Sequence, residues 1–115
     1  MSDFNTPTLT DVADFLETKV TYVALFTTTP TNTTPGTEVT GGSPAYARKA
    51  ITFTNGSAGQ TSGTVTFDVP AGTTVKGTGL YDAATAGNYK GGKASADEVF
   101  SSQGTYQVTI TLAAA

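Results

Sequence analysis

The segment TYQVTITL, residues 105–112, alternates apolar and polar side chains over its whole length. Successive side chains of a β-strand point to opposite faces of the sheet, so its four apolar residues share one face. These residues are Tyr106, Val108, Ile110 and Leu112. The segment TVTFDV, residues 64–69, repeats the pattern, and its inward residues are Val65, Phe67 and Val69. We expect both apolar faces to point into one core.

Four further segments are rich in β-branched and aromatic residues and are bounded by Gly, Pro or Asn, as strands are. They are residues 20–28, 45–54, 74–82 and 89–94. The first is apolar on both faces, which is typical of a covered strand. In the third, Gly77 and Gly79 predict a bulge or a close approach of another part of the chain. The intervening segments are predicted to be loops or irregular connections: 29–37, 55–63, 70–73, 83–88 and 95–104.

A helix is predicted only near the start of the chain. Thr8 and Asp11 match a capping box, and apolar residues follow at helical spacing, which predicts a helix over residues 9–18. Residues 1–8 are polar and are expected to form an extended arm, leaving residues 9–115 as one domain. The expected fold is all-β, an antiparallel β-sandwich, immunoglobulin-like or jelly-roll-like, of six to eight strands with one short N-terminal helix.

Composition narrows the function. The sequence contains no Cys and no His, which removes the thiolate nucleophile and the commonest general base, so we expect no enzymatic activity. Charged residues make up 13% of the chain and the net charge is −3, so no basic field is present to bind nucleic acid. No apolar run approaches membrane-spanning length, and the first residues do not resemble a signal peptide. We therefore expect folding in the cytoplasm and no membrane partner.

The strongest metal candidate is the segment YDAATAGN, residues 81–88, where Asp82, Thr85 and Asn88 could offer oxygen ligands to calcium. Only one of the three is charged, and Asp and Asn are ordinary turn residues. We therefore expect no metal site and no cofactor.

The segment AYARKAITF, residues 45–53, carries the only arginine of the sequence. If it is one strand, Ile51 and Phe53 mark the core face, and Tyr46 and Arg48 lie together on the outer face. Tyr and Arg are enriched at interface centres, so this pair is a candidate subunit contact. The alternative is an arginine stem that packs on a tyrosine at the surface.

Four motifs in order carry a family resemblance: TYVALFTTTP (21–30), TEVTGGSPAYARKAITF (37–53), VTFDVPAGTTVKGTGLYDAATAGN (65–88) and FSSQGTYQVTITL (100–112). The chain resembles small virion proteins of tailed bacteriophages, notably those of actinobacterial hosts. These are described as head-decoration, minor tail or tail-fibre-associated proteins. Two departures are that Thr27 replaces the usual His and Tyr81 the common Trp.

The resemblance implies a structural role in the virion, assembled in the host cytoplasm. The main expectation is a decoration protein on the outside of the capsid, bound to the major capsid protein. The alternative is a minor tail or tail-fibre protein involved in host attachment, with Tyr81 and Tyr89 as candidate carbohydrate platforms. We also expect self-association, with a trimer favoured. The exposed Thr/Pro loop, represented by Thr31, Asn32 and Thr33, is expected to add a subunit contact.

Overall fold

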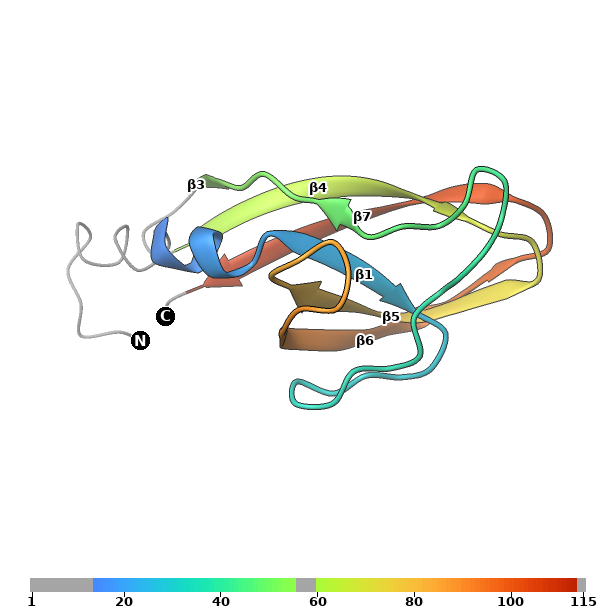
Figure 1. Ribbon diagram of the computed structural model, residues 1–115, viewed down its shortest axis with the longest axis horizontal. Coiled ribbons are helices and arrows are strands. Elements are labelled where there is room, and N and C mark those ends of the chain that lie inside the picture. Colours follow the sequence, from blue (N-terminus) through green and yellow to red (C-terminus); the bar gives the residue numbers. More distant parts are fainter. Residues whose placement is uncertain (1–13, 56–59, 114–115) are drawn as a thin grey trace.

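Seven strands form two antiparallel sheets in the computed structural model, which describes residues 14–55 and 60–113 (Figure 1). The strands are β1 (Tyr22–Phe26), β2 (Lys49–Ala50), β3 (Thr54–Asn55), β4 (Gln60–Val69), β5 (Thr73–Tyr81), β6 (Tyr89–Phe100) and β7 (Gly104–Ala113). One sheet has the order β2-β1-β5-β6 and the other the order β3-β4-β7. The sheets pack face to face, so the predicted all-β sandwich is confirmed.

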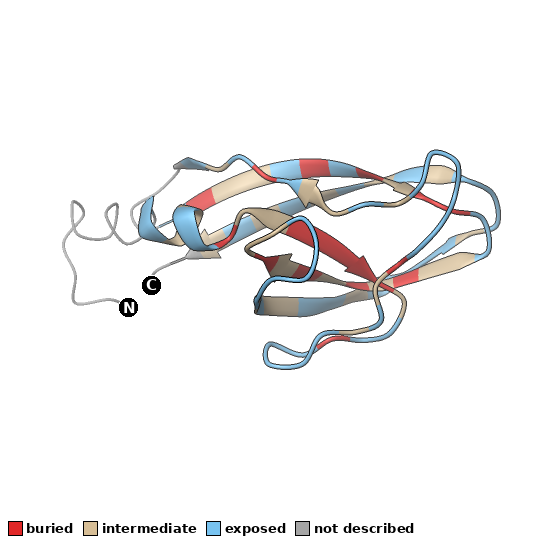
Figure 2. Cartoon of the chain, in the orientation of Figure 1, coloured by how far each residue is buried: buried red, intermediate tan, exposed pale blue. Residues whose placement is uncertain are grey.

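The core lies between the sheets and follows the predicted alternation. In β4, Val65 is 7% exposed and Phe67 and Val69 are fully buried. β1 is buried along most of its length, as its two apolar faces predict (Figure 2). Burying a side chain of this size contributes about 1.5–3 kcal/mol, so these few residues supply much of the driving force for folding.

The apolar face of β7 also points inward. Tyr106, Val108 and Ile110 are half-buried and pack against the core. The register predicted from the alternation is therefore confirmed for both β4 and β7.

Both glycines of β5 allow close contacts. A Cβ atom on Gly79 would lie 2.5 Å from two ring carbons of Phe26, and one on Gly77 would lie 2.4 Å from Pro30. The pairing of β5 with β6 also shifts register between Val75 and Gly77. The sequence predicted a bulge or a close approach, and the structure contains both.

Three predicted boundaries are wrong. Residues 45–54 do not form one strand, because the chain pairs with β1 only at β2, crosses to the other sheet and pairs with β4 at β3. The connection predicted over 55–63 is shorter, since β4 begins at Gln60. The segment predicted as irregular over 95–104 is mostly strand, because β6 continues through a bulge to Phe100 and β7 begins at Gly104.

The helix is described over residues 14–19. It lies at the end of the sandwich where β4 begins (Figure 1), and Thr61 donates a hydrogen bond of 3.0 Å to the Glu17 carboxylate. The predicted start of this helix and the predicted arm over 1–8 lie outside the described residues.

Candidate functional site

Arg48 joins two of the sequence motifs. Its Nε and Nη2 donate to the two carboxylate oxygens of Glu38, at 3.0 and 3.1 Å. Its Nη1 donates to the carbonyl oxygens of Ala83 and Ala86, at 3.2 and 2.7 Å. The guanidinium carbon lies 3.6 Å from the ring centroid of Tyr81. A planar fork that binds a carboxylate at two points and stacks on an aromatic ring is a geometry that lysine cannot reproduce.

Tyr46 completes this group, which we call the Arg48 cluster (Glu38, Tyr46, Arg48 and Tyr81). The Tyr46 hydroxyl donates to Glu38 at 2.8 Å and accepts the N–H of Leu25 at 2.9 Å. Its ring stacks on Phe67 with centroids 6.0 Å apart. Burial raises the pKa of the Tyr46 hydroxyl above its usual range, so the group stays a neutral donor.

The predicted outer-face position of Tyr46 and Arg48 is therefore wrong. The Arg48 side chain is 8% exposed and Tyr46 packs against the core. Residues 46–48 lie outside any strand, so the two-residue alternation that placed them outward does not hold there. A role of these residues at a subunit contact stays a prediction.

Neither Glu38 nor the contact of Tyr81 with Arg48 was predicted from the sequence. One sequence feature could have indicated the ion pair. Arg48 is the only arginine of the sequence, and Glu38 is the only acidic residue of the same motif, residues 37–53. Both Glu38 oxygens accept hydrogen bonds from Arg48 or Tyr46, so this carboxylate is held inside the cluster. A cleft of about 340 Å³ adjoins it, lined partly by Thr40, Gly41 and Thr85, and adds no further charged side chain.

The Thr/Pro loop has an exposed tip on a fixed base. Thr31, Asn32 and Thr33 are all exposed, as predicted. The Thr31 hydroxyl accepts the N–H of Thr34 at 3.0 Å, which closes a turn. Tyr89 donates its hydroxyl proton to the Thr31 carbonyl oxygen, which ties the loop to β6. Hydrogen bonds therefore hold the exposed tip in one conformation. Its contact with another subunit stays a prediction.

The candidate calcium residues close a turn. The Asp82 carboxylate accepts the backbone N–H of Asn88 at 2.7 Å and its side-chain amide at 2.9 Å. These hydrogen bonds hold the pKa of Asp82 below its usual value. Thr85 is exposed in the same turn. Within residues 14–55 and 60–113, no group of three or more acidic side chains gathers as metal ligands would.

The candidate carbohydrate platforms are not exposed aromatic faces. Tyr81 is 8% exposed beneath Arg48, and Tyr89 is half-buried with its ring packed 6.2 Å from that of Phe26. Glycan binding through Tyr81 is therefore not supported. No helix in the described part of the chain is long and apolar enough to cross a membrane.

Residues 8–111 match the family model described as podophage GP4 fiber I protein gp80. The chain belongs to this family. Membership in the gp80 family makes the protein a structural component of a phage and confirms that part of the resemblance. The match does not support the expected actinobacterial type or the expected head decoration. It fits the fibre alternative better. No match was found among the curated proteins or among the solved structures.

Proposed function

We propose that this protein is a non-enzymatic part of a phage tail fibre, held in the virion by contacts with other tail proteins. The observation that carries the proposal is the gp80 family match, which covers residues 8–111. The family match supports the fibre alternative better than the capsid decoration that was the main expectation.

The described side chains support a structural role. The most elaborate polar group, the Arg48 cluster, holds loops together, and both carboxylate oxygens of Glu38 accept hydrogen bonds from within it. Among the described residues, Thr is the commonest exposed residue and Ala the next, so few charges must be desolvated when a partner binds. Such a surface suits repeated contacts between proteins.

The location can be tested by counting copies. Quantitative mass spectrometry of purified virions, with the major capsid protein as internal standard, measures copies per particle. A handful of copies, together with electron-microscopic labelling of a tagged chain at the tail, is expected. Hundreds of copies spread over the head would support capsid decoration and overturn the fibre proposal.

A further inference from the structure

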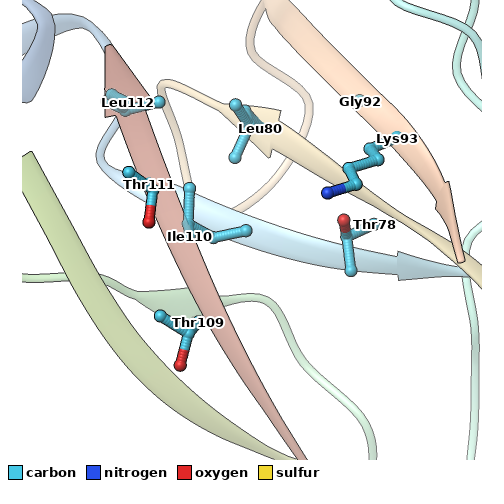
Figure 3. Close-up of a pocket in the computed structure, with 8 residues that line it drawn as sticks. All are labelled: Thr78, Leu80, Gly92, Lys93, Thr109, Ile110, Thr111 and Leu112. Atoms are coloured by element: carbon cyan, nitrogen blue, oxygen red, sulfur yellow. The ribbon is translucent and has the colours of Figure 1, made fainter. Parts of the chain in front are cut away.

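The two sheets have different numbers of strands, and their edge strands β6 and β7 border a groove. One sheet has four strands and the other three, and among the described residues β6 and β7 are edge strands of their sheets. A groove of about 290 Å³ runs between them, lined by β5, β6 and β7. Ile110 and Leu112 of β7 and Leu80 of β5 project into it (Figure 3). A second hollow of about 240 Å³ continues it towards Tyr106.

The apolar face of β7 is incompletely covered. The inward residues of β4, the neighbouring strand, are at most 7% exposed, whereas Tyr106, Val108 and Ile110 are only half-buried. The two strands are paired in one register over ten residues. The difference in burial therefore arises because β4 is the central strand of its sheet and β7 is an edge strand. A strand added beside β7 would widen the narrower sheet and cover these residues.

The four edge strands in the described part of the chain differ in how they are protected. β2 and β3 have two residues each, and short edges resist pairing. β6 is long but carries charges and is bulged opposite Lys76. Lysines, acidic residues and bulges are devices that keep an edge from joining another chain. The charged residues of β6 are Lys90, Lys93, Asp97 and Glu98.

β7 has none of these protections. Its ten residues include no charged residue and no proline, and its pairing with β4 has no register shift. A long, regular, uncharged edge is a template for another strand. The incoming strand is therefore expected at β7 and not at β6.

We propose that β7 pairs antiparallel with β7 of a second copy of this chain, joining two three-stranded sheets into one of six strands. A register centred on Thr109 places Gln107 opposite Thr111 and Val108 opposite Ile110. Apolar residues then meet apolar residues on the inner face, and hydroxyl and amide groups meet on the outer face. Because the strand carries no charge, no like charges oppose each other in the pair. The contact is the same on both copies, so it forms a twofold dimer instead of the expected trimer.

The proposal does not rest on the fibre assignment, because the same edge would pair in a capsid-bound protein. The test uses Gln107→Lys combined with Thr111→Lys. Both residues are exposed on the outer face, so the inward residues stay unchanged. The matched control is Thr64→Lys combined with Thr66→Lys, which adds the same charge to the same face one strand away from the edge.

Sedimentation velocity over a concentration series should show a wild-type dimer. The dimer dissociation constant of the β7 lysine variant should be higher than that of the wild type by about tenfold or more, because like charges then face each other across the pair. The control should dimerise like the wild type, and circular dichroism should show the same fold in all three. A wild-type monomer, a wild-type trimer, or equal loss in the control would overturn the proposal.

A charge-complementation experiment tests the strand pairing itself. The β7 lysine variant is mixed with Gln107→Glu combined with Thr111→Glu. At a concentration where each variant alone is monomeric, the mixture should form a heterodimer, since lysines face glutamates across the pair. Failure of the mixture to associate would contradict pairing through β7 even if the wild type is a dimer.

Discussion

Arg48 shows how one side chain can connect distant segments of the chain. Its four hydrogen bonds reach Glu38, ten residues earlier, and the turn that follows β5, more than thirty residues later. The sequence showed an arginine between Ala47 and Lys49, but not that its side chain is buried against Tyr81. The partners come from tertiary packing, which a two-residue period measured on one segment cannot report.

Replacing Arg48 should destabilise the fold strongly. Arg48→Met keeps an apolar stem but removes the arginine's hydrogen bonds to the Glu38 carboxylate and to two carbonyl oxygens, so we expect a loss of about 2–4 kcal/mol in the free energy of unfolding. Urea denaturation measures it. The control is Lys76→Met, which breaks an ion pair of 2.8 Å with Asp97 whose side chains are 38% and 55% exposed. That change should cost less than about 1 kcal/mol. Equal losses would contradict the structural role of Arg48.

Tyr46→Phe tests the contribution of the Tyr46 hydroxyl to stability separately from that of its ring. The ring can still stack on Phe67, but the N–H of Leu25 loses its acceptor and Glu38 loses a donor. We expect a loss of about 1–2 kcal/mol, measured by thermal denaturation. Tyr22→Phe is the control, because the Tyr22 hydroxyl has no hydrogen-bond partner among the described residues, and it should change stability by about 0.5 kcal/mol or less.

At the scale of elements, regular alternation was a reliable guide. β4 and β7 were predicted with the correct inward faces because ten paired residues keep one period. β2 and β3 were not separated, because each has two residues and the chain changes sheets between them. The second half of β6 was missed because a bulge and polar residues hide its period. The Arg48 cluster was missed because Glu38, Tyr46 and Arg48 lie outside the strands, where the two-residue period does not hold.

The close approach of β1 and β5 depends on Gly79. In Gly79→Ala the new methyl group would overlap the Phe26 ring, so we expect a loss of about 1–3 kcal/mol in unfolding free energy. Combining it with Phe26→Leu should cost less than the sum of the two single changes, since the smaller side chain makes room. Strict additivity in urea denaturation would show that the overlap is not the cause.

The turn from Asp82 to Asn88 should make stability depend on acid pH. The pKa of Asp82 is lower in the folded protein than in the unfolded chain, where an aspartate has a pKa of about 3.9. Its contribution is therefore complete above that pH and is lost as the pH falls through the folded value. Asp82→Asn should lower the melting temperature at neutral pH and flatten its fall below about pH 4. An unchanged acid profile would exclude this role.

At the scale of the whole molecule, the described chain is an elongated sandwich, 47 Å by 24 Å by 23 Å. The β4–β5 and β6–β7 connections lie together at one end, and the helix lies at the other (Figure 1). The Thr/Pro loop projects from the side of the sheet that contains β1 (Figure 1). The loop tip and the β7 edge are therefore separate surfaces, and a fibre protein could use one for its own copy and the other for a different tail protein.

Replacing the loop tip should reduce assembly without reducing stability. We expect the combined change Thr31→Ala, Asn32→Ala and Thr33→Ala to lower incorporation into virions, because the exposed side chains that a neighbouring protein could contact are removed. Thr31 holds a turn through its hydroxyl, so Asn32→Ala alone, which leaves that turn intact, is a second variant. The matched control is Ser101→Ala combined with Ser102→Ala, in the exposed turn between β6 and β7. Incorporation is measured by mass spectrometry of particles from a complemented deletion phage, and normal incorporation of both loop variants would remove the loop as a contact.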